Sequence, residues 1–497
     1  MAAIAIMIQF SIFKHFYPFP NFIHGDSFVY LRAAYDNAPV SLHPIGYSKF
    51  LRLFSVFSAS DMVLTAFQYL LIQVSALGFI FTIFCLYKPR QIIEGLLIAT
   101  VVFDPIFLHL ANLISAEVIF VALSLIWFTL LLWILHRPTP NLIVWHALVL
   151  FLAFTVRYNA FYYPIISIVA FLLSRQKLYY KLSGIAAGLL LIGGFIFLTS
   201  QEYAAFIGKK VFSPFSGWQL ANNALYAYRH IDSAKRKPVP LKFQQVDRIV
   251  RTYFDTSRNI SAHPMEMSEA STVYMWTPES PLQLYMMKEY RLDQSIKDSS
   301  TRNYNRWASA GPLLGEYGVW LIRQYPEEFI YNYLWPNTIQ YYTPPLEFLS
   351  AYNMGLDTIR PIAQTWFGFK SDKVTTKFRD PTASSLEFYP FFSAIVNGLF
   401  LCCILGFSFM IGFKQQTDFS RLVILTGTLW LLNFGFSVFA SPIALRYQVF
   451  TLLTFLSISL ILMDYIYNNS SQKEKGKKMM IAAGSSIIGN AVETPPF

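Results

Sequence analysis

Long, nearly uncharged runs of apolar residues constrain this chain more than any other feature of its sequence. A helix rises 1.5 Å per residue, so about 20 such residues cross the hydrocarbon layer of a bilayer. Backbone amides find no water in lipid, so a run that crosses it must be helical. The sequence therefore predicts an all-α polytopic membrane protein with about ten transmembrane helices. We expect these helices at residues 1–18, 62–87, 92–109, 113–135, 142–156, 160–174, 183–200, 388–413, 420–440 and 444–466.

The composition agrees with a membrane protein and excludes several other classes. Hydrophobic residues make up 55% of the chain and charged residues only 13%. The net charge of +11 comes from basic residues spread between apolar runs rather than gathered in an arm, so no nucleic acid is expected as a partner. The three cysteines lie inside apolar runs and have no disulfide or zinc-site spacing. Residues 1–18 lack a basic start and a cleavage site, so we expect a first span rather than a signal peptide.

The basic residues in short loops predict which way the chain crosses the membrane. Cytoplasmic loops are enriched in Lys and Arg, whereas long loops cross regardless of charge. Both termini are therefore expected in the cytoplasm, with loop 1 (residues 19–61) and segment 201–387 outside. We expect a bacterial inner membrane. The basic residues on the cytoplasmic side are Lys88, Arg90, Arg137, Arg175, Lys177, Lys181, Lys414, Arg421, Lys473, Lys475, Lys477 and Lys478.

This topology predicts four regions. Residues 1–200 form an N-terminal transmembrane catalytic module, and residues 201–387 form an extracytoplasmic insertion. Residues 388–467 form the C-terminal transmembrane helices, and residues 468–497 form a polar cytoplasmic tail that we expect to be disordered. The insertion is rich in Tyr and Trp, which prefer the membrane–water boundary. We therefore expect a largely helical cap that lies on the bilayer.

Four ionisable residues fall near the predicted outer ends of the spans. Asp26 follows the first span, Glu117 opens the fourth, Arg157 follows the fifth, and Arg446 opens the last. Charged groups at membrane depth are costly, so they pair with one another, line a wet cavity or serve a function. Two carboxylates and two arginines at one membrane face predict an anionic ligand beside an acid–base group.

Loop 1 has a pattern of its own. The stretch "GDSFVYLRAAYD" starts with a helix N-cap signature, and "HPIGY" is a Pro/Gly turn. The next stretch, "SKFLRLFSVF", predicts an interfacial amphipathic helix with Lys49 and Arg52 facing lipid phosphates. Its apolar stripe consists of Phe50, Leu53, Phe54 and Phe57.

Together these features resemble the GT-C superfamily of polyprenyl-phosphate-sugar-dependent glycosyltransferases. That superfamily includes protein O-mannosyltransferases and the aminoarabinose transferase of lipid A. The resemblance rests on the acid after the first span, the "HPIGY" turn, the acid that opens a later span, "VRYNAFYYP" and the final-span "LRY". It covers roughly residues 1–200 and the last two spans, and it does not extend to segment 201–387.

The resemblance implies an inverting transfer of a sugar from a polyprenyl-phosphate donor to an extracytoplasmic acceptor, which is a protein, a lipid or a glycan. It implies Asp26 as the general base. Glu117, the other residue of the catalytic pair, would orient the acceptor or the sugar hydroxyls, or hold Arg157 in place. Arg446 and Arg157 would bind the lipid phosphate. No cofactor is implied. The stretch "GDS" has a single acid rather than a pair of acids, so a divalent metal is possible but not indicated. Lys49 and Arg52 would assist at the phosphate, and further substrate contacts are expected from Tyr30, His43, Asp104, Asn159 and Tyr447.

Structural explanations remain open for the same residues. Charged and capping side chains at helix ends often serve the fold alone. Asp26 could be a helix N-cap, Glu117 could pair with Arg157, Arg446 could be an interfacial anchor, Asp104 could hold broken backbone before Pro105, and His24 and His43 could be surface residues.

Two other functions also remain open. A transporter or flippase for a lipid-linked or anionic solute would have repeated halves and charges near mid-membrane. The sequence shows neither feature. A catalytically inactive scaffold with the same fold is the third possibility.

Overall fold

The computed structural model describes residues 2–255, 272–378, 382–410, 418–440 and 442–489. All regular secondary structure in these ranges is helical, and the β-type contacts there are isolated bridges such as Asn21–Leu113. The predicted all-α class is therefore confirmed.

Seven helices in the described residues are long and apolar enough to cross a membrane. Three more of the expected runs are helical but shorter, so the predicted count of about ten spans is not confirmed. The seven are Asp61–Tyr87, Gln91–Ala111, Glu117–His136, Leu178–Ile207, Ser384–Met410, Asp418–Ala440 and Leu445–Asn468, and the shorter three are Ala2–Phe16, Pro140–Val156 and Tyr158–Leu173.

These helices form a bundle around one central helix. Helix α7 (Glu117–His136) contributes large buried side chains such as Trp127 and packs against α4, α8, α9 and α22. Its sequence is apolar on all sides, as expected for a helix surrounded by protein. The bundle consists of α1 (Ala2–Phe16), α4 (Asp61–Tyr87), α5 (Gln91–Phe103), α6 (Pro105–Ala111), α7, α8 (Pro140–Val156), α9 (Tyr163–Leu173), α10 (Leu178–Ile207), α20 (Tyr389–Met410), α21 (Asp418–Ala440) and α22 (Leu445–Gly489).

The first part of the insertion has a hydrophobic core of its own. Helices α11 (Pro214–Tyr228) and α16 (Ser299–Gln324) approach closely, because a Cβ at Gly217 would lie 2.0 Å from the carbonyl oxygen of Gly311. Trp218 and Trp307 stack in this core with ring centroids 5.0 Å apart. We call this part the cap. Its other described helices are η2 (Ser233–Lys235), η3 (Leu241–Phe243), α12 (Gln244–Asp255), α14 (Val273–Trp276), α15 (Pro281–Glu289), α17 (Pro326–Phe329) and η5 (Ile330–Leu334), and α18 (Trp335–Tyr342) follows it.

The second part of the insertion belongs to the core of the bundle instead. Leu349, Tyr352 and Ala363 are buried in the same cluster as the transmembrane helices. The hydroxyl of Tyr352 donates to the carbonyl of Pro20 at 3.1 Å, which ties this part to loop 1. The insertion is thus two units with different cores. The short helices of the second part are η6 (Glu347–Leu349), η7 (Tyr352–Gly355), α19 (Pro361–Phe367) and η8 (Ser384–Leu386).

Hydrogen bonds attach the insertion to the end of α21. The last carbonyls of a helix lack partners within it. Asn223 and Tyr333 donate to the carbonyl of Phe439, each at 3.1 Å, and Asn337 donates to that of Val438 at 2.9 Å. These bonds fix the cap on the helix that precedes α22.

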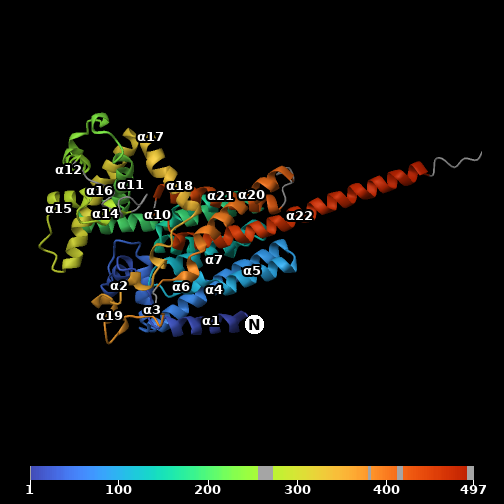
Figure 1. Ribbon diagram of the computed structural model, residues 1–497, viewed down its shortest axis with the longest axis horizontal. Coiled ribbons are helices and arrows are strands. Elements are labelled where there is room, and N and C mark those ends of the chain that lie inside the picture. Colours follow the sequence, from blue (N-terminus) through green and yellow to red (C-terminus); the bar gives the residue numbers. More distant parts are fainter. Residues whose placement is uncertain (1, 256–271, 379–381, 411–417, 441, 490–497) are drawn as a thin grey trace, which may run out of the picture.

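The cap and loop 1 lie at the same end of the bundle (Figure 1). At the opposite end lie the start of α1, the turn between α4 and α5, and the far part of α22. The boundary expected at residue 200 falls inside α10, and α22 stays helical to Gly489, into the tail expected to be disordered. Residues 411–413 of an expected span, Lys414, and residues 490–497 of the tail lie outside the described residues.

Candidate functional site

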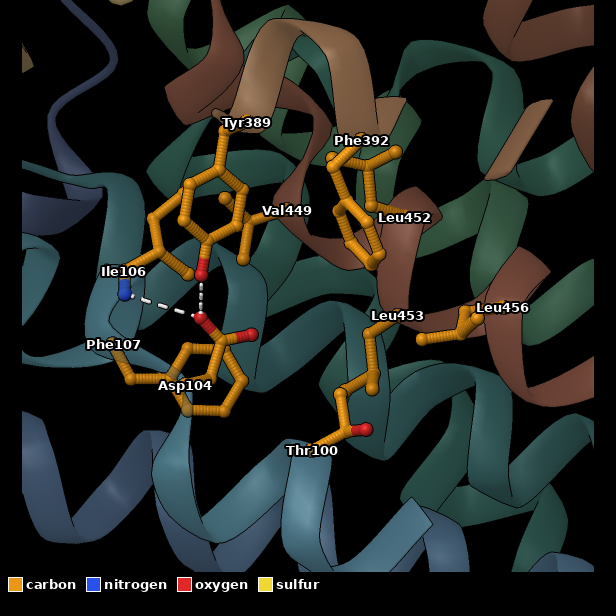
Figure 2. Close-up of a pocket in the computed structure, with 10 residues that line it drawn as sticks. All are labelled: Thr100, Asp104, Ile106, Phe107, Tyr389, Phe392, Val449, Leu452, Leu453 and Leu456. Carbon is orange, nitrogen blue, oxygen red and sulfur yellow. Dashed lines mark hydrogen bonds between the residues drawn. The ribbon is translucent and has the colours of Figure 1, made fainter. Parts of the chain in front are cut away.

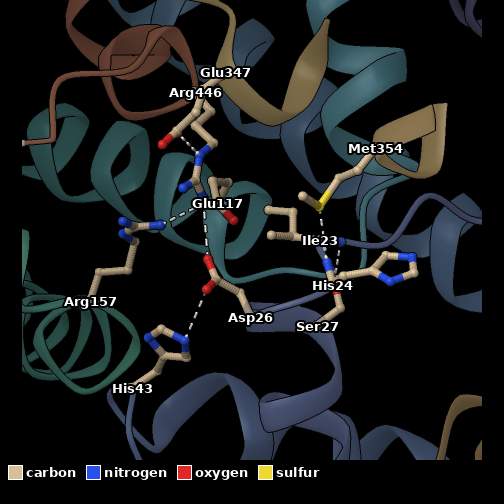
Figure 3. A network of polar contacts seen from close by, with 10 residues as sticks. All are labelled: Ile23, His24, Asp26, Ser27, His43, Glu117, Arg157, Glu347, Met354 and Arg446. Carbon is tan, nitrogen blue, oxygen red and sulfur yellow. Dashed lines mark hydrogen bonds and ion pairs between the residues drawn. The ribbon is translucent and has the colours of Figure 1, made fainter. Parts of the chain in front are cut away.

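Four sequence-predicted residues meet at the capped end of the bundle (Figure 3). Each stands at a helix end: Asp26 opens α2 (Asp26–Tyr35), Glu117 opens α7, Arg157 follows α8, and Arg446 is the second residue of α22. Four separate segments of the chain thus place charged groups at one point. We call the following set the ionic network: Asp26, His43, Glu117, Arg157, Glu347 and Arg446.

Glu117 is the centre of the ionic network. Its Oε1 accepts hydrogen bonds from Arg157 Nη1 at 2.8 Å and from Arg446 Nη1. The side chains of Glu117 and Arg446 are each only 2% exposed. A buried charge is tolerated only with good partners, so Glu117 and the two arginines depend on one another. The pairing of Glu117 with Arg157 that the sequence left open is present.

Asp26 points into the ionic network rather than capping its helix. Gly25 is the N-cap of α2, and it makes no side-chain capping bond. Asp26 Oδ1 lies 3.2 Å from His43 Nε2, and Asp26 Oδ2 lies 3.7 Å from Arg446 Nη1. Burial alone would raise the pKa of Asp26, but His43, and then Arg446 and Arg157, lower it well below its usual range. The carboxylate is therefore ionised at neutral pH.

Two tyrosines line the ionic network. The ring centroid of Tyr447 lies 4.2 Å from the guanidinium carbon of Arg157 and 4.2 Å from that of Arg446. These are cation–π contacts, which help to hold both guanidinium groups. The ring of Tyr30 is buried with its centroid 4.9 Å from that of His43. Asn159, half-buried in η1 (Tyr158–Tyr162), lies two residues after Arg157.

The "HPIGY" turn places loop 1 against the end of α8. Helix α3 (Gly46–Ser55) begins at the glycine of this turn. A Cβ at Gly46 would lie 2.6 Å from the carbonyl oxygen of Thr155, so a side chain there would push α3 away from α8. The glycine therefore allows the close approach that brings His43 and Asp26 beside Arg157.

Lys49 and Arg52 make hydrogen bonds at the C-terminal end of α2. Lys49 Nζ donates to Asn37 Oδ1 at 2.8 Å. Arg52 Nη1 donates to the carbonyls of Ala34 and Tyr35, at 3.1 and 3.2 Å, at the C-terminal end of α2. Both side chains thus hold the end of α2 in place, as basic groups commonly do at helix C-termini.

Asp104 also lies apart from the ionic network (Figure 2). It is the N-cap of α6, where its side chain accepts from Ile106 N at 3.1 Å, and it also accepts a hydrogen bond from the hydroxyl of Tyr389. The small pocket beside it is lined mainly by apolar groups, including Phe392 and Leu453. Asp104 therefore holds the break between α5 and α6, where Pro105 offers no amide hydrogen. This contact matches the structural explanation rather than the expected substrate contact.

Glu347 is a member of the ionic network that sequence reasoning missed. Its Oε2 accepts a hydrogen bond from Arg446 Nε at 3.0 Å. The ring centroid of its neighbour Phe348 lies 4.9 Å from the guanidinium carbon of Arg446. The stretch "YTPPLEF" looked only like a turn in the insertion, since no local pattern links it to an arginine 99 residues later.

Among the described residues no group of three or more His, Cys, Asp or Glu side chains could hold a metal ion. In comparisons with known proteins, no protein-family model, no curated protein and no solved structure matches this chain. The function therefore has to be argued from the ionic network.

Proposed function

We propose that this protein is a membrane glycosyltransferase that moves a sugar from a polyprenyl-phosphate donor to an acceptor. The observation that carries the proposal is the meeting of Asp26, Glu117, Arg157 and Arg446 in one ionic network. Such a transfer needs an acid–base group for the acceptor's proton and cationic groups for the phosphate, and a carboxylate beside two guanidinium groups supplies both. The resemblance of the sequence to the GT-C superfamily supports the same reaction.

Asp26 is the proposed general base. The acceptor's oxygen or nitrogen forms a bond to the anomeric carbon while its proton passes to the Asp26 carboxylate. The bond from that carbon to the phosphate oxygen breaks, and the phosphate takes the electron pair. A carboxylate with a lowered pKa is a weak base. Asp26 therefore holds the acceptor by a hydrogen bond and takes the proton only late, a contribution of about 10²–10⁴-fold.

The two arginines are the proposed binding groups for the phosphate. The leaving polyprenyl phosphate gains negative charge as the bond breaks, so preorganised cations stabilise the transition state more than the bound donor. Arg157 and Arg446 are held by Glu117 and by the ring of Tyr447, so they need no rearrangement at that moment. Glu117 then acts mainly by holding the arginines.

The position of the charges favours an enzyme over a transporter. Transporters bind their substrates near mid-membrane at broken helices. Here the charged residues of the ionic network stand at helix ends, beside loop 1 and the second part of the insertion. We place this end at the extracytoplasmic face of the bacterial inner membrane, where donor and acceptor meet at the lipid surface.

The direct test uses the purified full-length protein with a panel of polyprenyl-phosphate sugars. Sugar transfer to membrane lipid and protein fractions and release of polyprenyl phosphate are measured for wild type and for Asp26→Asn. We expect wild-type turnover with at least one donor and a loss of about 10²-fold or more in the variant, with donor binding retained. The matched control is Asp36→Asn, at the C-cap of the same helix, where the carboxylate pairs with Arg32 at the surface.

Full activity of Asp26→Asn would show that Asp26 is not the general base. Uptake of a labelled lipid-linked sugar into vesicles without any transfer would instead identify a transporter or flippase.

A further inference from the structure

Glu347 reaches Arg446 from the second part of the insertion. The hydrogen bond from Arg446 Nε to Glu347 Oε2 is 3.0 Å long. One residue before Arg446, the amide of Leu445 donates to the carbonyl of Pro345 at 3.0 Å. The segment around Glu347 is therefore bonded both to the side chain of Arg446 and to the start of the helix that carries it.

Arg446 is shared by more carboxylates than any other cation of the ionic network. Three carboxylates, those of Asp26, Glu117 and Glu347, surround the Arg446 guanidinium group, and Arg157 supplies the second positive charge. Lys49 and Arg52 are bonded to the end of α2 and its following turn. A phosphate anion that binds Arg446 therefore comes close to these carboxylates, and like charges repel strongly at a partly buried site.

Of the three carboxylates, that of Glu347 can leave Arg446 most easily. Glu117 is 2% exposed and bonded to both arginines, and Asp26 pairs with His43 as well as with Arg446. The side chain of Glu347 is 24% exposed, and Arg446 is its one ion-pair partner among the described residues. Glu347 also begins a short 3₁₀ turn, η6, rather than a long helix. Its carboxylate can therefore leave Arg446 without moving a transmembrane helix.

Backbone strain is concentrated in the same segment, which holds three of the five non-glycine residues with positive φ angles in the described part of the chain. Glu347, Asn353 and Met354 have positive φ angles of 50°, 48° and 56°, which residues other than glycine rarely adopt. Such strain persists where surrounding contacts impose it, and it gathers at ligand clamps. Asn353 is held by Asn21 Oδ1, 2.7 Å from its amide nitrogen, so the segment is fixed to loop 1 at one end and to Arg446 at the other.

We propose that Glu347 is a resident counter-ion of Arg446 that the phosphate of a polyprenyl-phosphate donor replaces. This inference rests on the proposed glycosyltransferase function. The exchange keeps the charge balanced, because one monoanionic carboxylate leaves and one monoanionic phosphodiester enters. After transfer the polyprenyl phosphate carries a further negative charge, and the returning carboxylate repels it. Glu347 is then a positioning residue that tunes phosphate affinity and product release.

The test compares binding of short-chain polyprenyl phosphate to wild type and Glu347→Gln. We expect the variant to bind the lipid phosphate roughly tenfold more tightly, a change of about 1.4 kcal/mol, and to show stronger product inhibition in turnover assays. A purely structural glutamate would not tighten binding when neutralised. Glu327→Gln, at an exposed glutamate of the cap, is the matched control and should bind as wild type does.

Each alternative result has a defined meaning. Wild-type turnover with unchanged or weaker lipid-phosphate binding in Glu347→Gln overturns the counter-ion role and leaves the glycosyltransferase proposal intact. If Glu347→Gln gains equally in affinity for inorganic phosphate alone, the site binds a free anion. That result would overturn the proposal that the phosphate belongs to a lipid donor. Absence of lipid-phosphate binding in every form of the protein removes the proposed function and this inference with it.

A second variant, Glu347→Ala, covers the case in which glutamine prevents folding. Loss of folding in both variants would overturn the proposal, since an exchangeable counter-ion cannot be essential for the fold.

Discussion

At the residue scale, the buried carboxylate of Glu117 is the group on which the ionic network depends. Glu117→Gln would leave the buried guanidinium groups of Arg157 and Arg446 without their shared counter-ion. Removing one partner of a buried ion pair costs about 3–5 kcal/mol. We therefore expect the free energy of unfolding to fall by roughly that amount, measured by SDS titration of the purified protein with circular dichroism.

The surface substitution Glu327→Gln is the control for this measurement, and it should leave the free energy of unfolding within about 0.5 kcal/mol of wild type. An unchanged curve for Glu117→Gln would show that solvent or another anion already neutralises the two arginines.

The sequence predicted part of the ionic network because charge at the end of an apolar run is a strong local signal. Asp26, Glu117, Arg157 and Arg446 stand out in that way, and the structure brings them together. Glu347 has no such signal, because it belongs to a polar insertion and meets its partner only through the tertiary fold. The hydrogen bonds of Lys49 and Arg52 could not be predicted for the same reason, because their acceptors lie on α2 and in the turn after it, and loop periodicity does not encode that contact.

At the element scale, the long apolar helices were predictable, whereas the division of the insertion into two units was not. Lipid forces a continuous apolar run into a helix, so α4 and α21 begin within two residues of their predicted starts. Segment 201–387 has no such constraint, and its aromatic residues fill two cores. One is the cap's own, and the other is that of the bundle. Composition alone does not distinguish these two uses of the same residue types.

The close contact between α3 and α8 helps to position loop 1, and it gives a prediction for Gly46→Ala. The new methyl group would lie 2.6 Å from the backbone carbonyl of Thr155, so α3 has to move away from α8. Overpacking of this kind costs about 1–3 kcal/mol. We expect that loss in the same SDS titration, together with slower sugar transfer, because His43 and Asp26 shift relative to Arg157.

Gly25→Ala is the matched control in the same loop, since a Cβ at Gly25 meets nothing within 4 Å and its φ of −79° suits any residue. Equal effects of the two substitutions would show that the contact between α3 and α8 does not position the loop.

At the scale of the whole molecule, the ionic network draws on both halves of the bundle and on the insertion. Asp26, Glu117 and Arg157 come from the N-terminal spans and their loops, and Arg446 from the last span. The second part of the insertion supplies Glu347 and is tied to loop 1 through Tyr352 and Asn353. A site assembled in this way forms only when the complete chain is folded, so its side of the membrane is a property of the whole topology.

That topology can be measured by labelling single cysteines in a chain whose Cys85, Cys402 and Cys403 are replaced by alanine. Ser300 is exposed near the start of α16, which an ion pair of 2.9 Å between Asp298 and Arg32 joins to α2. Asn141 is exposed at the start of α8, whereas Arg157 follows the other end of that helix. In spheroplasts, we expect a membrane-impermeant maleimide to modify Ser300→Cys directly and Asn141→Cys only after permeabilisation. The reverse pattern would put the ionic network at the cytoplasmic face, away from an extracytoplasmic acceptor.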